Sequence, residues 1–126
     1  RIFDWDRKDE NGNSRELHTE LALDAIDFKK KNDYHLPYEK LLNRSSNIAS
    51  CRYFVTNYMK ITGNLCKDYS LTDSFVIFIC VQGKAVIKIS QNEEILLFGE
   101  SILIPAYIKE VFIASEDCEL LEVTVP

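Results

Sequence analysis

The strongest hydrophobic pattern of the chain lies between residues 74 and 90. Its first half, 75–81, is seven consecutive apolar residues, rich in the β-branched and aromatic types that favour strands. Its second half, 84–90, alternates between apolar and polar positions apart from Val86, which is typical of a half-exposed strand. Gly83, between the halves, can adopt the positive φ of a tight turn. We therefore predict a β-hairpin that turns at Gln82-Gly83, at the centre of a layered β-structure.

The chain keeps this β character from Cys51 onward, in short apolar or alternating runs separated by turn-forming residues such as Gly63-Asn64 and Glu116-Asp117. We predict strands at 51–62, 74–81, 84–90, 93–98, 101–105, 109–114 and 119–125, with a further short one near 66–70. About eight short strands at a spacing near ten residues indicate a sandwich or a small barrel.

The pattern gives several positions in these strands a definite expected orientation. Phe78 has apolar neighbours on both sides along its strand, so we expect it in the core. In the last run, Leu121 and Val123 alternate with Glu122 and Thr124. This alternation predicts that Leu121, Val123 and Val125 point inward and that Glu122 and Thr124 point outward.

The chain before Cys51 has a different pattern. Residues 1–7 mix charged and aromatic side chains and predict a short strand or extended segment, followed by a turn over 8–14 around Asn11-Gly12. Apolar residues then recur every four positions from Leu17, which predicts a short helix that extends to Phe28 and is capped by Asn13 or Ser14. Residues 29–50 are mostly polar and are expected to form a linker.

Composition and charge limit the partners of the protein. A chain of 126 residues with 46 % apolar and 28 % charged residues is typical of one soluble globular domain. The net charge of −5 argues against a nucleic-acid partner, because a surface that neutralises phosphates is usually basic. No apolar run approaches the roughly 20 residues that cross a bilayer, so we expect no membrane span. The oligomeric state, including a homo-oligomer, stays open.

The cysteines and histidines do not form a recognisable metal site. The four cysteines contain no CxxC pair, and we expect them to be reduced thiols in a cytoplasmic protein. His18 and His35 lie 17 residues apart with no third histidine, which is not a convincing metal-ligand pattern. His18, at the start of the predicted helix, fits a local hydrogen-bonding role, and His35 is expected to be exposed. The chain opens within a strand-like run without a methionine, so we expect a fragment of a longer protein.

The first family resemblance lies in FGESILIPAYIKEV, residues 98–111. Gly99 and Pro105, separated by five residues, resemble the second motif of cupins, which are small double-sheet jelly rolls. We expect the glycine in the turn into a strand and the proline where that strand leaves the sheet edge. Metal-binding cupins carry a histidine shortly after this proline and two more in their first motif. Here residues 106–111 contain no histidine, and no HxH occurs anywhere. The resemblance implies a mostly β, cupin-like double-sheet jelly roll without a metal site, preceded by one short N-terminal helix.

A sharper resemblance begins at the N-terminus. RIFDWDRKDENGNSRELHTELALDAIDF resembles the segment of short bacterial class I mannose-6-phosphate isomerases that follows their last zinc-ligand histidine. The stretches YFVTNYMKI, DSFVIFICVQG and ILIPAYIKEV resemble the C-terminal domain of the same family. The resemblance implies that residues 1–28 are the tail end of a catalytic domain and that 51–126 are a metal-free C-terminal cupin domain. The whole enzyme would interconvert mannose 6-phosphate and fructose 6-phosphate.

The same resemblance implies which residues take part in the chemistry. The zinc ion of the family would be bound upstream of residue 1, so that this chain contains no zinc ligand and is inactive alone. The resemblance makes Arg1 a catalytic residue beside the zinc and Arg7 a substrate-binding residue, both suited to a phosphorylated, negatively charged substrate. Alternatively, both arginines are structural and pair with nearby aspartates. A different reading of the chain as a whole is a metal-free cupin that binds a sugar or packs against a partner without chemistry.

Overall fold

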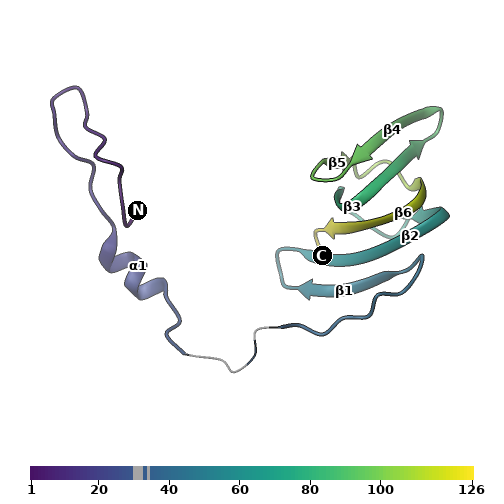
Figure 1. Cartoon of the computed structure of the whole chain (residues 1–126), viewed down its shortest axis with the longest axis horizontal. Helices are drawn as coiled ribbons and strands as arrows, with labels where there is room; N and C mark the ends of the chain where they lie inside the picture. The colour runs from purple at the N-terminus through teal and green to yellow at the C-terminus, as the bar shows by residue number, and fades with distance from the viewer. Residues whose placement is uncertain (30–32, 34) are drawn as a thin grey trace. The chain divides into compact units, whose positions relative to one another are not determined.

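The computed structural model describes residues 1–29, 33 and 35–126, and these form two compact units, 1–35 and 36–126 (Figure 1). We call them the N-terminal unit and the β-domain. Residues 30–32 and 34, which belong to the predicted linker, lie outside the described residues. The N-terminal unit contains helix α1 (Thr19–Ala25), and the β-domain contains all the named strands.

The β-domain is a six-stranded antiparallel sheet. Its spatial order is β1-β2-β6-β3-β4, and β5 pairs with β3 beside β4. The strands are β1 (Ser45–Ser50), β2 (Val55–Asp68), β3 (Val76–Ile89), β4 (Asn92–Leu97), β5 (Ser101–Ile104) and β6 (Glu110–Thr124). The strands of the sheet are curved, as Figure 1 shows. The chain is therefore mostly β with one short helix, as the sequence predicted.

The predicted hairpin at Gln82-Gly83 is wrong. β3 runs through these residues without turning, although its register against β6 shifts on both sides of them. Gly83 has a φ of +74°, and a Cβ there would clash with the carbonyl oxygen of Asp117. The glycine is needed because the β6 backbone passes very close to it, and because the bulge requires a positive φ.

The turns predicted at Gly63-Asn64 and Glu116-Asp117 are wrong for the same reason. β2 continues through Gly63, where its register against β6 also shifts, and β6 continues through Glu116 and Asp117. Gly63 pairs with Ser115, and Gly83 pairs with Cys118, so the irregular positions of the three long strands lie near one another. Because each bulge bends its strand, we infer that this line of bulges bends the sheet around its core.

The tight hairpin of the domain joins β3 to β4. Ile89 pairs with Asn92, and only Ser90 and Gln91 lie between them. Ser90 adopts a positive φ of 54° to make this turn. Farther along, Gly99 (φ 85°) lies in the turn between β4 and β5, and Pro105 directly follows β5. These are the positions that the Gly99–Pro105 spacing predicted.

Strand β1 lies in the segment that the sequence analysis assigned to the linker. It forms an edge of the sheet, where Ser45 pairs with Met59 and Ser50 with Val55. The preceding residues are also fixed to β2. The side chain of Asn43 accepts a hydrogen bond from the N–H of Thr62 (3.0 Å) and donates one to its carbonyl (3.0 Å). The β-domain thus begins before residue 51.

The core lies on the concave face of the sheet and draws on every strand from β2 to β6. Phe78 has no exposed surface, which confirms its predicted place. β3 and β6 contribute buried residues on both sides of their irregular positions, so one core supports both halves of these strands. Its members are Met59, Ile61, Tyr69, Val76, Phe78, Cys80, Ala85, Ile87, Leu96, Ile104, Val111, Ile113, Cys118 and Leu120. All four cysteines are free thiols.

None of the described residues of the N-terminal unit is buried. α1 is shorter than predicted and buries none of its residues. His18 occupies its N-cap position without a side-chain cap hydrogen bond, so the predicted capping by Asn13 or Ser14 is wrong. The predicted turn over 8–14 is confirmed: Asp9 Oδ1 accepts hydrogen bonds from the backbone N–H groups of Asn11 (2.9 Å) and Asn13 (2.8 Å). No helix among the described residues is long and apolar enough to cross a membrane.

Candidate functional site

Arg1 is held against the stretch that leads into α1. Its carbonyl accepts a hydrogen bond from the backbone N–H of His18 (2.6 Å). Its guanidinium donates from Nη1 to the carbonyl of Glu16 (2.9 Å). Both hydrogen bonds join a residue before the turn over 8–14 to a residue after it, so that residue 1 lies beside residues 16–18. Arg1 is exposed, and one of its five N–H donors is used in this contact.

A bidentate ion pair joins the same two stretches. Arg15 donates from Nε to Oδ2 of Asp4 (2.9 Å) and from Nη2 to Oδ1 (2.5 Å). The hydrogen bond from Arg15 lowers the pKa of the Asp4 carboxyl. The positive charges of Arg1 and Arg7 lower that pKa further, so both guanidiniums lie within electrostatic reach of Asp4. The ion-pair partner of Asp4 is Arg15, a residue that the sequence analysis did not single out.

The two histidines have separate environments. His18 precedes the first residue of α1, and its carbonyl accepts a helical hydrogen bond from Ala22 (3.0 Å). His35 is exposed, and its backbone N–H donates to Oδ1 of Asp33 (2.8 Å). Among the described residues, no group of three or more histidine, cysteine, aspartate or glutamate side chains is placed to hold a metal ion. The described side chains therefore do not fit the zinc ion of the isomerase family.

The β-domain contains a polar cluster that the sequence analysis missed. Glu122 is 2 % exposed and lies on the core face of β6, beside Leu120. The predicted outward orientation of Glu122 is therefore wrong. Leu121 and Val123, predicted to point inward, lie on the opposite, half-buried face, and Val125, also predicted to point inward, is exposed. The alternation was misleading because Leu120 is apolar too. With apolar residues on both faces of β6, hydrophobicity alone does not decide which face is the core.

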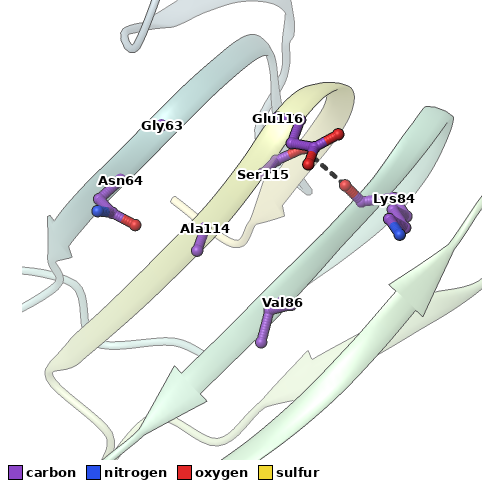
Figure 2. A pocket seen from close by; sticks show the side chains of 7 residues that line it. All are labelled: Gly63, Asn64, Lys84, Val86, Ala114, Ser115 and Glu116. Atoms are coloured by element: carbon purple, nitrogen blue, oxygen red, sulfur yellow. Dashed lines mark hydrogen bonds between the residues drawn. The ribbon is translucent and has the colours of Figure 1, made fainter.

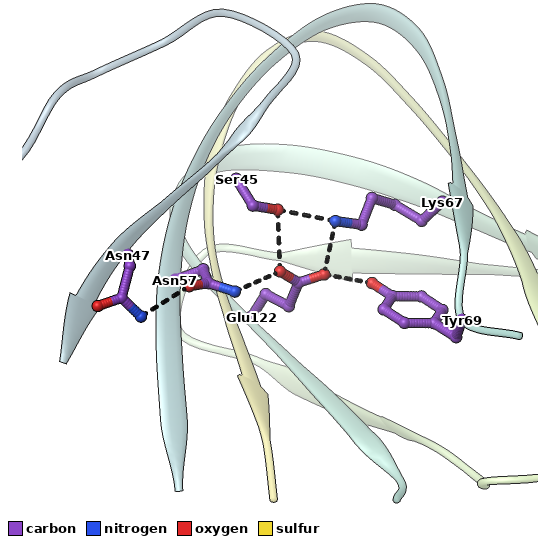
Figure 3. Close-up of polar contacts among 6 residues, drawn as sticks. All are labelled: Ser45, Asn47, Asn57, Lys67, Tyr69 and Glu122. Atoms are coloured by element: carbon purple, nitrogen blue, oxygen red, sulfur yellow. Dashed lines mark hydrogen bonds and ion pairs between the residues drawn. The ribbon is translucent and has the colours of Figure 1, made fainter. Parts of the chain in front are cut away.

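Four side chains surround the Glu122 carboxylate (Figure 3). Lys67 Nζ lies 2.9 Å from Oε1, and the Tyr69 hydroxyl donates a hydrogen bond to the same oxygen. Ser45 Oγ and Asn57 Nδ2 each donate to Oε2 at 2.9 Å. Lys67 also donates to Ser45 Oγ at 2.7 Å. We call these five residues the Glu122 cluster.

The electrostatics of the cluster favour an ionised carboxylate. Burial by itself would raise the pKa of Glu122, but the charge of Lys67 and the hydrogen bonds from Tyr69 and Asn57 outweigh it and hold the pKa below its ordinary value. Burial and the Glu122 charge both raise the pKa of Tyr69, which keeps its hydroxyl protonated as a donor. The cluster links β1, β2 and β6 through satisfied polar contacts, so its geometry suits a structural role.

A hollow of about 340 Å³ lies on the other face of the sheet, along the line of bulges (Figure 2). Val86 and Ala114 are half-buried within it, whereas Asn64, Lys84 and Glu116 are exposed. Ser115 Oγ donates a hydrogen bond to the carbonyl of Lys84 (2.7 Å), which joins β6 to β3 beside the hollow. Gly63 completes the lining. The hollow combines an amide, an ammonium and a carboxylate group with small apolar side chains.

The family model described as the cupin domain of mannose-6-phosphate isomerase matches residues 45–125. The chain belongs to this family. The match covers β1 to β6, including the strand that the sequence analysis had placed in the linker. The resemblance to mannose-6-phosphate isomerases that the sequence suggested is thereby confirmed.

Individual relatives agree with the family. The chain is 26 % identical to mannose-6-phosphate isomerase of Streptococcus mutans over 110 residues, which are 86 % of this chain and 34 % of the relative. The crystal structure of mannose 6-phosphate isomerase from Bacillus subtilis matches 98 % of this chain and 39 % of its own, with 25 % identity and a TM-score of 0.64. The chain thus spans about a third of the length of the curated relative.

A cupin-2 domain protein from Shewanella frigidimarina supports the fold alone. Its crystal structure matches 87 % of this chain and 94 % of its own, at 16 % identity and a TM-score of 0.56. The cupin architecture inferred from the Gly99–Pro105 spacing is thereby confirmed.

Proposed function

We propose that this chain is the C-terminal part of a zinc-dependent mannose-6-phosphate isomerase, which interconverts mannose 6-phosphate and fructose 6-phosphate in the cytoplasm. The observation that supports this most strongly is the extent of the likeness to the B. subtilis isomerase. It covers 98 % of the chain and therefore reaches beyond the cupin match, which begins at residue 45, into the N-terminal unit. The 26 % identity to the S. mutans isomerase extends over 110 residues and likewise exceeds the cupin match over 45–125.

The two units have different roles in this proposal. Residues 1–28 belong to the catalytic domain, and the β-domain, which includes β1, supports it without a metal. Several large apolar side chains of the N-terminal unit are more than 60 % exposed, which fits a segment that packs against further protein. They are Ile2, Phe3, Trp5, Leu21 and Phe28. Since the described side chains do not fit zinc, we assign the zinc ligands to residues outside this chain.

Arg1 is the proposed catalytic residue and Arg7 the proposed substrate-binding residue. Isomerisation of an aldose to a ketose builds negative charge on an enediolate oxygen, and a positioned guanidinium stabilises that charge. The substrate also carries a phosphate, for which a guanidinium is a suitable partner because it donates two parallel hydrogen bonds. Arg1 and Arg7 lie on the same short segment, and both act electrostatically on Asp4, so two guanidiniums share one local surface.

An isomerase assay tests this proposal. The purified 126-residue chain should fold through its β-domain but convert no mannose 6-phosphate, with or without added zinc. In the intact isomerase that contains this sequence, Arg1→Ala should lower turnover by about tenfold or more, because a cation is lost from a charged transition state. Zinc content should not change, since arginine is not a ligand. Arg52→Ala, which removes an exposed guanidinium from the β-domain, is the matched control.

Two results would contradict the proposal. Turnover by the isolated chain would mean that its own residues suffice for the chemistry, and near-normal turnover of the Arg1→Ala enzyme would remove the proposed catalytic group. A second candidate function is a metal-free cupin that binds a sugar or packs against a partner without chemistry. The hollow lined by Asn64, Lys84 and Glu116 favours it, because amide, ammonium and carboxylate groups are suitable hydrogen-bond partners for sugar hydroxyls. This candidate predicts that the intact protein has no isomerase activity.

A further inference from the structure

Arg15 has no role in the function proposed so far, although it makes the closest ion pair of the N-terminal unit. Both of its bonds to Asp4 are short, at 2.9 Å and 2.5 Å, and together they occupy both carboxylate oxygens. The Asp4 side chain is 9 % exposed, whereas that of Arg15 is 45 % exposed. A bidentate pair of this kind fixes the orientation of the carboxylate as well as its charge.

Asp4 is also an acid within electrostatic reach of the two proposed functional arginines. The charges of Arg1 and Arg7 both act on it. An aspartate free to rotate beside two guanidiniums would pair with one of them, because charge-assisted bonds to a carboxylate are among the strongest polar contacts. The guanidinium so engaged would then have to leave Asp4 before it could bind a phosphate or an enediolate oxygen.

We propose that Arg15 is a positioning residue for the isomerase reaction: by binding both oxygens of Asp4, it keeps Asp4 from pairing with Arg1 and Arg7 and leaves their guanidiniums free for the phosphorylated sugar. This inference rests on the proposed function. It gives the Arg15–Asp4 ion pair a role in the reaction, in addition to joining two extended stretches of the chain.

The backbone around Arg15 supports the same role. Glu16, the next residue, accepts the hydrogen bond from Arg1 Nη1, and His18 donates to the Arg1 carbonyl. The stretch 15–18 therefore fixes Arg1 directly while its first residue holds Asp4. A change in the side chain of Arg15 leaves these two contacts in place, since both are made by backbone groups of other residues. Arg15 can thus be tested separately from the restraint on Arg1.

The test is a set of variants of the intact isomerase that contains this sequence. We expect Arg15→Ala to lower kcat/KM for mannose 6-phosphate by about tenfold, with a raised KM, because a small displacement of a positioned group is enough for such a loss. The kcat/KM of Arg15→Lys should lie between those of Arg15→Ala and the unmodified enzyme. A lysine ammonium retains the charge but does not bind both carboxylate oxygens in the way that a guanidinium does. The double variant Arg15→Ala with Asp4→Asn should recover to within about threefold of the unmodified enzyme, because no carboxylate remains to capture Arg1 or Arg7.

The recovery of kcat/KM in the double variant distinguishes a positioning role of Arg15 from a purely structural one. If the pair only joined the two stretches, the double variant would be no better than Arg15→Ala, and that result would overturn the inference. Unchanged kcat/KM in Arg15→Ala, alongside impaired Arg1→Ala, would overturn it too. Melting temperatures are measured for each variant, and Arg15→Gln replaces Arg15→Ala if the latter does not fold. Normal turnover of Arg1→Ala would instead contradict the proposed function, so the two failures are distinguishable. Arg52→Ala controls for the loss of an arginine elsewhere.

Discussion

Lys67 Nζ lies 2.9 Å from Glu122 Oε1 on the core face of the sheet, with the carboxylate almost fully buried. The pair connects β2 to β6, and Ser45 extends the connection to β1. A buried ion pair of this kind costs desolvation of both charges, which the surrounding hydrogen bonds offset. Its net contribution to stability is therefore small, whereas the loss of one partner is severe.

The first prediction follows from that asymmetry. Lys67→Met leaves the Glu122 carboxylate buried without its cation and should lower the free energy of unfolding by about 3–5 kcal/mol. The double variant Lys67→Met with Glu122→Gln, which removes both charges, should recover much of that loss. Urea denaturation of the 126-residue chain measures both. A single variant as stable as the unmodified chain would show that the pair is not buried in solution.

The second prediction concerns acid stability. The folded-state pKa of Glu122 is lowered from its ordinary value of 4.5, so the unfolded chain takes up a proton on this group before the folded chain does. The contribution of Glu122 is therefore complete above pH 4.5 and is lost as the pH falls through the folded pKa. Melting temperatures between pH 7 and pH 3 should fall less steeply below pH 4.5 for Glu122→Gln than for the unmodified chain. Parallel curves would contradict the lowered pKa.

The third prediction separates a close backbone approach from backbone conformation. Gly83 and Gly63 have nearly the same φ, +74° and +80°, but a Cβ on Gly83 would meet the Asp117 carbonyl oxygen, whereas one on Gly63 has nothing within 4 Å. Gly63→Ala should cost about 1 kcal/mol, for the positive φ alone. Gly83→Ala should cost at least about 2 kcal/mol more, because β3 and β6 must separate. Chemical denaturation measures the difference, and equal losses would refute the close approach.

The fourth prediction concerns the centre of the core. Phe78→Ala should lower the free energy of unfolding by about 3–5 kcal/mol, since the phenyl ring is fully buried between β3 and Tyr69, whose ring centre lies 6.4 Å away. Phe98→Ala is the matched control, because that ring is 72 % exposed in the turn after β4 and its loss should change stability by less than about 0.5 kcal/mol. A loss below about 2 kcal/mol for Phe78→Ala would place it outside the core.

The sequence predicted the fold class because alternation and β-branched runs directly report a sheet. It placed Phe78 correctly, and it placed Gly99 and Pro105 correctly at the two ends of β5. It divided β2, β3 and β6 in two, because Gly63, Gly83 and the acidic pair at 116–117 favour bulges as readily as turns. The choice between the two depends on whether a neighbouring strand continues past them, and no local pattern reports that.

The candidate site was less predictable than the fold. Arg1 and Arg7 were singled out through a family resemblance, and whether they act in catalysis is still a prediction. Arg15 was overlooked because its partner Asp4 lies eleven residues away, across a turn. Glu122 was misplaced because both faces of β6 are apolar. β1 was missed because Ser45, Ser46, Asn47 and Ser50 are polar or small, and its place in the sheet comes from pairing with β2 and from the Glu122 cluster.

The spatial order β1-β2-β6-β3-β4 also has a consequence for how the domain is made. β6 is the last strand in the sequence, yet it lies between β2 and β3, and Val55 pairs with Thr124 across most of the domain's length. Until β6 has been synthesised, β2 and β3 each present a long unpaired edge to other chains. Contacts this distant in sequence form slowly, so premature termination before β6 should yield aggregation rather than a smaller folded domain.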